Sequence, residues 1–151
     1  MRPSWRGRIA LLGAGLAGLV WLDQARPAAG PPLEWRSDLD LALAEAEVEA
    51  RPALVSFHAV WCAACRQLDR QTLRNPEVAR ALAAFERVRV DRSHDDSRTR
   101  AAMRRFGVVG LPTLVWIDRA GQRAGSIVGF VGRSQLLDWA HRTSAARSDA
   151  E

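Results

Sequence analysis

Lysine is absent from this 151-residue chain, and all 22 of its basic residues are arginine. The formal net charge of +5 raises the question of nucleic-acid binding. No basic cluster with interleaved aromatic residues accompanies this charge, and an arginine-only set of basic residues is better explained by codon composition. We therefore predict no nucleic-acid partner.

Cysteine and histidine are also scarce. Cys62 and Cys65 are the only cysteines, and the three histidines, His58, His94 and His141, do not have the spacing of a zinc finger. A purely structural disulfide in so short a loop would stabilise the fold only weakly. Two unrelated buried thiols are the remaining alternative, but a Cys-x-x-Cys pair between a strand and a helix is typical of redox proteins. We predict a redox dithiol without a metal or an organic cofactor.

The sequence around the cysteines supplies that context. The apolar run 53–60 predicts a buried strand, and the pattern of 67–73 favours a helix. Cys62 then lies at the start of a helix, where free N–H groups and the helix dipole favour a thiolate, and Arg66 adds a nearby cation. Cys65, one helical turn further on, is placed to close a disulfide and release a bound partner.

The first 30 residues predict a signal peptide or a signal anchor. Arginines precede an apolar run at 9–22, which is short for a membrane span of about 20 residues, and a proline-rich spacer extends to residue 32. No clean cleavage site follows the apolar run. A cleaved form and a form tethered to the membrane through 9–22 both stay open, and either one predicts export to the periplasm.

The remaining chain predicts one α/β domain over 33–144, with a mixed sheet between helices and a polar tail at 145–151. The expected strands are 33–36, 53–60, 88–90, 112–117 and 126–130. The expected helices are 38–50 capped by Ser37, 67–73, a stretch after the cap Asn75, 97–106 closed by Gly107, and 133–144. The polar stretch 94–97 is interpreted as a helix-capping turn, with a metal site as the alternative. Pro112 begins an apolar strand, and the Leu111–Pro112 bond is a candidate cis bond.

Over 33–143 the chain resembles the thioredoxin superfamily. Trp61-Cys62-Ala63-Ala64-Cys65-Arg66 resembles its active-site motif, and Gly110-Leu111-Pro112-Thr113 resembles its cis-proline loop. Within the superfamily, the segment 72–78 and the residues 121–122 and 128–130 are similar to the C-terminal periplasmic domain of the DsbD family of thiol:disulfide interchange reductases. The resemblance implies a thioredoxin fold with a central mixed β-sheet flanked by helices.

The resemblance also implies roles for individual residues. Cys62 would be the exposed attacking thiolate, Cys65 the resolving thiol, and Pro112 would shape the groove for a partner's chain. Trp61, Leu111 and Thr113 would contact the substrate. The implied partners are protein thiols and disulfides, together with an upstream electron-donor protein, because the sequence has no multi-span membrane domain to deliver electrons.

Two positions depart from the family pattern. A buried acid often precedes the first cysteine by six residues, and Ser56 occupies that position here. Asp69 follows Cys65 by four residues and is expected on the same helical face, where it would move protons for Cys65 or would simply be solvated. His58 is expected to be a packed core histidine.

We predict an exported thiol-disulfide oxidoreductase that acts as a reductant of protein disulfides. The alternative from another class is a non-catalytic or copper-handling thioredoxin-like module that uses Cys62, Cys65 and a histidine. The cysteine spacing argues against copper, because copper carriers of this fold more usually separate their cysteines by three residues.

Overall fold

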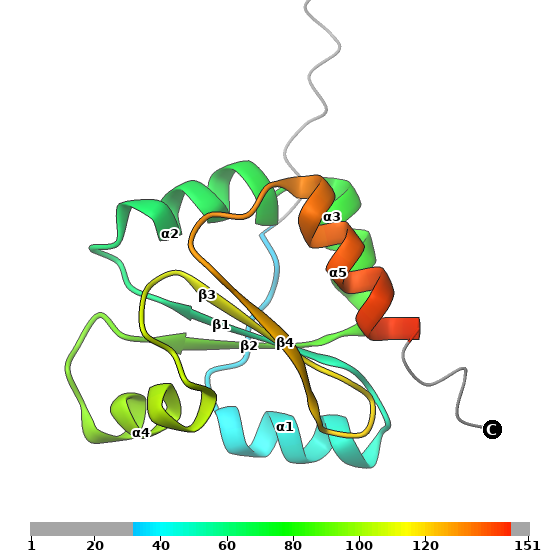
Figure 1. Ribbon diagram of the computed structural model, residues 1–151, viewed down its shortest axis with the longest axis horizontal. Coiled ribbons are helices and arrows are strands. Elements are labelled where there is room, and N and C mark those ends of the chain that lie inside the picture. The colour runs from blue at the N-terminus through cyan, green and yellow to red at the C-terminus, as the bar shows by residue number, and fades with distance from the viewer. Residues whose placement is uncertain (1–31, 146–151) are drawn as a thin grey trace, which may run out of the picture.

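The computed structural model describes residues 32–145, which form a four-stranded sheet between two layers of helices (Figure 1). The strands are β1 (Ala53–His58), β2 (Glu86–Asp91), β3 (Thr113–Ile117) and β4 (Arg123–Val128). Their order in the sheet is β2-β1-β3-β4, with β1 parallel to β2 and antiparallel to β3, and with β3 antiparallel to β4. The expected mixed sheet is confirmed. The predicted signal or anchor segment, and nearly all of its spacer and of the polar tail, lie outside the described residues.

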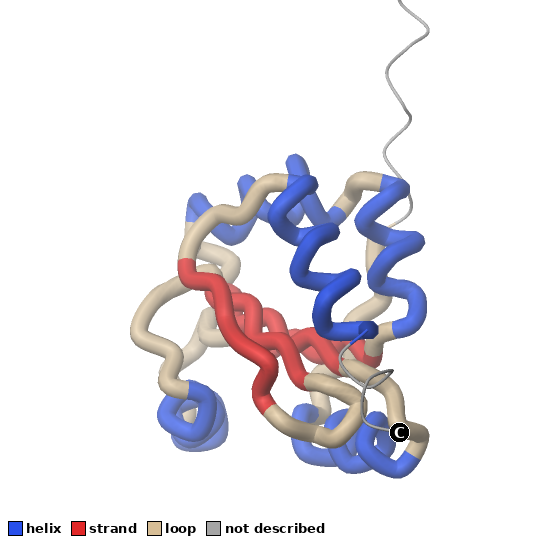
Figure 2. Tube along the Cα trace, turned by 45° about the vertical axis from the view of Figure 1, so that its right-hand side comes forward, coloured by secondary structure: helices blue, strands red, loops and turns tan. Residues whose placement is uncertain are grey.

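The helices divide between the two faces of the sheet. Their bounds are α1 (Leu39–Val48), α2 (Ala63–Leu68), α3 (Pro76–Ala81), α4 (Ser97–Phe106) and α5 (Arg133–Ala145), with a π-helix η1 (Asp69–Leu73) and a 3-10 turn η2 (Leu82–Ala84). Figure 2 shows helices above and below the strands. Successive side chains of a strand point to opposite faces, so Val55 and Phe57 pack with α1 and α4, whereas Leu54 packs with α2, α3 and α5. Two apolar cores result, one on each face.

Several predicted helix ends are confirmed because their signals are local. The Asn75 side chain accepts hydrogen bonds from the backbone N–H groups of Glu77 and Val78, with Pro76 at the first helical position. Gly107 ends α4 with a φ of +62°. A residue in the left-handed conformation lets backbone N–H groups reach the last carbonyls of a helix, and glycine adopts this conformation most readily.

The first helix differs from the prediction at both ends. Its cap is Asp38, whose carboxylate accepts the N–H of Leu41, and not Ser37. Asp and Ser cap equally well, so the choice depends on where the chain turns. The helix stops at Val48, and Ala50 has a φ of +51°, which is incompatible with its continuation to that residue.

The predicted strand at 33–36 is wrong except for one residue. Arg36 alone forms a parallel bridge to Val88, by donating its N–H to the Arg87 carbonyl and accepting the N–H of Arg89. The chain then turns toward α1, so the ladder cannot continue. Leu33 and Trp35 instead pack against the core on the α3 and α5 side.

The helix after the cysteines also differs from the prediction. Over 69–73 the chain adopts π rather than α geometry, and the N–H of Arg74 bonds to the carbonyl of Asp69, five residues back. The last strand of the hairpin begins at Arg123 and ends at Val128, earlier than predicted, since Gly129 with a φ of +90° leaves the extended conformation. Within residues 32–145, no helix combines the length and the apolar character needed to cross a membrane.

Candidate active site

Three loops meet at one end of the sheet because the neighbouring strands β1, β3 and β4 alternate in direction. Phe57 near the end of β1 pairs with Thr113 at the start of β3, and Thr113 pairs with Val128 at the end of β4. The loop that follows β1, the loop that precedes β3 and the loop that follows β4 are therefore neighbours. The two cysteines lie in the first of these loops and in the helix that it enters.

Cys62 and Cys65 form a disulfide, with their Cα atoms 5.2 Å apart. Cys62 is the cap residue of α2, and its Sγ accepts the backbone N–H of Cys65 at 3.1 Å. The predicted position at a junction between strand and helix is confirmed. An N–H group aimed at Sγ would stabilise a Cys62 thiolate after reduction.

The disulfide is more covered than the resemblance implied. Cys62 is 8% exposed and Cys65 is 2% exposed, although Cys62 was expected to be exposed. The cover comes from Ala59, Ala64 and Leu111, which pack against the two sulfur-bearing side chains. Cys62 is nevertheless the more accessible of the two.

The loop before β3 is held from two sides. The Leu111–Pro112 peptide bond is cis, and Pro112 is buried. The Thr113 hydroxyl donates to the Gly110 carbonyl at 2.7 Å, and the Pro112 carbonyl accepts the N–H of Gly129 at 2.7 Å. The cis-proline loop is thus fixed both to itself and to the loop after β4.

An apolar rim lines these three loops. Of the seven large apolar residues that are exposed in the described part of the chain, five belong to the rim, namely Val60, Trp61, Val109, Val128 and Phe130. The other two, Leu41 and Val48, lie on α1. Exposed apolar side chains that gather around one site are typical of a binding surface for another protein.

Polar side chains lie beneath α2 on the same face of the sheet. Arg89 of β2 pairs with Asp69 through Nη2 and Oδ1 at 2.7 Å, and its guanidinium stacks over Trp35 at 4.4 Å from the ring centroid. Ser56 lies beside Arg89 in the sheet register and is fully buried, and its hydroxyl has no hydrogen-bond partner among residues 32–145. Asp69 therefore lies against a cation. Its role in moving protons for Cys65 stays a prediction.

His58 is mostly covered at the end of β1, as expected of a packed histidine. Its Nε2 lies 3.9 Å from Oδ1 of Asp91, and its side chain is 16% exposed. Burial and the nearby Arg89 lower the pKa of His58, against the opposing attraction of Asp91 and Asp69.

Sequence reasoning missed three residues around the site: Arg89, Asp91 and Ser93. The first two were detectable, because Val88 and Val90 point to one face of β2, which places Arg89 and Asp91 on the other. Ser93 lies beyond the strand and left no comparable signal.

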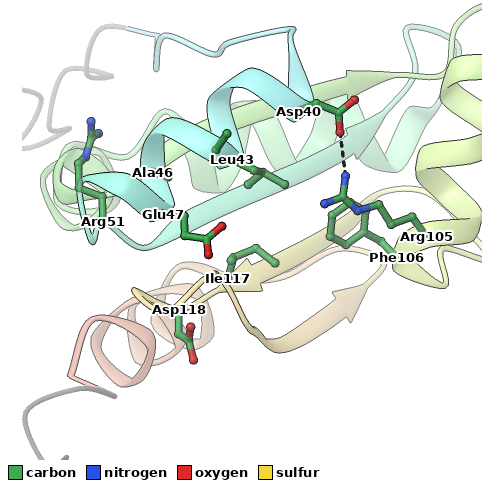
Figure 3. Close-up of a pocket in the computed structure, with 11 residues that line it drawn as sticks. Asp40, Leu43, Ala46, Glu47, Arg51, Arg105, Phe106, Ile117 and Asp118 are labelled. Atoms are coloured by element: carbon green, nitrogen blue, oxygen red, sulfur yellow. Dashed lines mark hydrogen bonds and ion pairs between the residues drawn. The ribbon is translucent and has the colours of Figure 1, made fainter.

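The cavity in Figure 3 belongs to the opposite side of the sheet. Its volume is about 190 Å³, and Phe106 and Ile117 are among its lining residues, while an ion pair between Asp40 and Arg105 at 2.8 Å borders it. No residue of the disulfide site lines this cavity. Within residues 32–145, no three histidine, cysteine or acidic side chains are grouped to hold a metal ion.

The sheet, the disulfide at the head of α2 and the adjacent cis-proline loop define a protein of the thioredoxin-fold class. The family model described as a thioredoxin-like domain matches residues 39–143, and the chain belongs to this family.

Several known proteins are similar to the chain. The thiol:disulfide interchange protein DsbD 2 of Pseudomonas aeruginosa is 34% identical over 103 residues, which cover 67% of this chain and 18% of that protein. The thiol:disulfide interchange protein DsbD of Haemophilus ducreyi is 29% identical over 133 residues, which cover 83% of this chain and 23% of that protein. The chain thus spans less than a quarter of the length of these relatives.

Solved structures agree on the fold. The C-terminal domain of DsbD from Neisseria meningitidis in the oxidised form matches with a TM-score of 0.62 at 22% identity, covering 74% of this chain and 100% of that one. A thioredoxin from Thermus thermophilus matches with a TM-score of 0.64 at 28% identity, covering 77% of this chain and 93% of that one.

Proposed function

We propose that this chain is a thiol-disulfide oxidoreductase that reduces disulfide bonds in other proteins. The observation that carries the proposal is the Cys62–Cys65 disulfide at the head of α2, bordered by an exposed apolar rim. The similarity to two thiol:disulfide interchange proteins supports it.

The reaction is an exchange in two steps. In the reduced protein, the Cys62 thiolate attacks one sulfur of a partner disulfide, forming a mixed disulfide and releasing the other partner sulfur as a thiolate. Cys65, deprotonated, then attacks Cys62 Sγ, which forms the Cys62–Cys65 disulfide and releases the second partner sulfur. Two electrons pass to the partner. An upstream donor protein restores the dithiol by the same exchange in reverse.

The geometry supports different roles for the two cysteines. Cys62 is the more accessible and has an N–H group aimed at its sulfur, so it is the attacking residue. Cys65 is almost fully buried behind it and reacts only within the mixed disulfide.

The apolar rim and the cis-proline loop form the partner surface. Trp61 is 61% exposed and offers a large contact area beside Cys62. Pro112 and Leu111 shape the part of this surface next to the disulfide, where Leu111 packs against the cysteines. Thr113 is 2% exposed, and its hydroxyl donates to the Gly110 carbonyl. We therefore propose that Thr113 shapes the loop and does not contact the partner through its side chain.

Export to the periplasm, through a cleaved signal peptide or through a tether at 9–22, is part of the proposal. The sequence pattern of residues 1–30 supports it.

The cysteine variants test the proposal. Cys62→Ser is expected to abolish reduction of insulin, because the nucleophile is lost. Cys65→Ser is expected to keep the attack but block release, so that partner-linked species accumulate on non-reducing gels of an exporting host. Near wild-type insulin reduction by Cys62→Ser, or no linked species with Cys65→Ser, would refute the assignment. A copper titration of the reduced protein in parallel tests the copper-handling alternative.

A further inference from the structure

The backbone of Val60, two residues before Cys62, is hydrogen-bonded through both its N–H and its carbonyl group. Its N–H donates to Ser93 Oγ at 2.9 Å, and its carbonyl accepts Nη1 of Arg66 at 2.6 Å. Ser93 lies in the loop after β2 and Arg66 lies on α2, so two separate parts of the fold hold the backbone of one residue, Val60. The side chain of Val60 is 63% exposed, and that of the next residue, Trp61, is 61% exposed.

Asp91 sets the orientation of the Ser93 hydroxyl. Both the hydroxyl and the backbone N–H of Ser93 donate to Oδ1 of Asp91. A hydroxyl whose proton is committed to a carboxylate presents its lone pairs elsewhere, here to the Val60 N–H. Burial opposes ionisation of Asp91, but the hydrogen bonds from Ser93 lower its pKa, so the carboxylate remains an acceptor at neutral pH.

We propose that Ser93, oriented by Asp91, is a positioning residue that fixes the Val60–Trp61 edge of the apolar rim for binding a partner protein. This inference rests on the proposed function. The physical reason is that Val60 and Trp61 have little packing of their own to hold them, and a partner that binds a mobile edge must order it at a cost in affinity. Ser93 lowers that cost by holding the backbone before the partner arrives.

The role separates binding from chemistry. The Ser93 hydroxyl bonds to the Val60 N–H, whereas the hydrogen bond at Cys62 Sγ comes from Cys65. Loss of Ser93 should therefore weaken the use of a bulky protein disulfide and spare the reaction with a small dithiol that does not touch the rim.

Ser93→Ala tests the proposal, with Ser93→Thr as the variant that keeps the hydroxyl. Ser144→Ala is the matched control, because its hydroxyl bonds within α5 to the His141 carbonyl, away from the loop. Losing one hydrogen bond in Ser93→Ala is expected to raise KM for insulin about fivefold. The kcat for insulin should stay within about twofold of wild type, and so should the rate at which dithiothreitol reduces the oxidised protein. Ser93→Thr should restore the wild-type KM.

Amide hydrogen exchange at Val60, followed by NMR, gives a readout that does not depend on activity. Exchange is expected to accelerate at least about fivefold in Ser93→Ala and to be unchanged in Ser144→Ala. Unchanged Val60 exchange, an unchanged KM, or equal losses with insulin and dithiothreitol would overturn the positioning role. Failure of the wild-type protein to reduce insulin would instead refute the proposed function. The exchange experiment would still show whether Ser93 holds the Val60 backbone.

Discussion

His58 lies between a cation and an anion at the end of β1. Burial disfavours its protonation most, Arg89 on the neighbouring strand adds to that effect, and Asp91 and Asp69 oppose it. The 3.9 Å separation from Asp91 is too long for a strong hydrogen bond, which fits a neutral imidazole at neutral pH. His58 is therefore a residue whose charging would act against the fold.

A pH dependence of stability follows from this lowered pKa. In the unfolded chain a histidine titrates near its ordinary value of about 6.5. Because folded His58 resists protonation, the unfolded state binds more protons below that value, and stability is lost as the pH falls from about 6.5 toward the lower folded pKa. The free energy of unfolding, measured in urea at several pH values, should thus decline less between about pH 6.5 and 5 in His58→Gln than in the wild type.

The matched control for that experiment is His141→Gln, which changes an exposed histidine of α5. It should leave the decline unchanged. The lowered pKa of Asp91 adds a separate loss of stability, confined to more acidic solutions below about pH 4, so the two effects do not overlap. Equal slopes for wild type and His58→Gln would contradict the account.

At the scale of elements, the break from α2 into η1 is joined to the loop after β4. Thr72 of η1 is fully buried, and its hydroxyl donates to the Val131 carbonyl at 2.7 Å. Val131 is itself fully buried and follows the rim residue Phe130. The hydrogen bond thereby connects the active-site helix to one side of the apolar rim.

Thr72→Val removes this hydrogen bond while keeping the side-chain shape. The Val131 carbonyl loses a buried donor, so we expect a loss of about 1–3 kcal/mol in the free energy of unfolding. Thr72→Ser, which keeps the hydroxyl, should lose clearly less. Chemical denaturation measures both variants, and a loss in Thr72→Val no larger than the loss in Thr72→Ser would contradict a dominant role for the hydrogen bond.

The packing of α5 on the sheet depends on a glycine in β4. Trp139 stacks on Trp116 with ring centroids 6.2 Å apart, and Gly125 lies beside Trp116 in the register. A Cβ atom at Gly125 would collide with the Trp139 ring, whereas one at Gly132 would meet no atom of the described residues within 4 Å.

Gly125→Ala is therefore expected to cost about 1–3 kcal/mol of stability, because the ring or the helix must shift. The matched control Gly132→Ala should stay within about 0.5 kcal/mol of the wild type. Thermal and urea unfolding compare the two. Similar values for both variants would mean that α5 adjusts freely to the added methyl group.

Prediction from sequence succeeded where a signal is local. The Asn75 cap, the Gly107 stop and the junction at Cys62 each depend on a few adjacent residues. It failed at 33–36, where pairing depends on how the chain approaches β2, and at 69–73, where π and α geometry share one sequence pattern. The contacts of Arg89 and Ser93 join residues 20 and 33 positions apart, so they depend on the register of the folded sheet.

At the scale of the whole molecule, the chain presents one cysteine pair at one end of a four-stranded sheet. Neither Ala63 nor Ala64 has a side-chain donor for Cys62, and the hydrogen bond to Cys62 Sγ comes from the Cys65 backbone. Strongly oxidising Cys-x-x-Cys proteins owe their high reduction potential to a heavily stabilised thiolate. Position 56 acts in the opposite direction, toward a more oxidising protein. It holds a serine where the family often has a buried acid, so one source of thiolate destabilisation is missing. On balance we expect a reductant that depends on an upstream donor.

The reduction potential of the Cys62–Cys65 couple tests this account most directly. The protein is equilibrated with a series of glutathione or dithiothreitol buffers, and the reduced fraction is counted by thiol alkylation and mass spectrometry. The account predicts a potential nearer to that of thioredoxin, about −270 mV, than to that of DsbA, about −120 mV. A potential near the DsbA value, or a dithiol that does not exchange with the buffer, would contradict it.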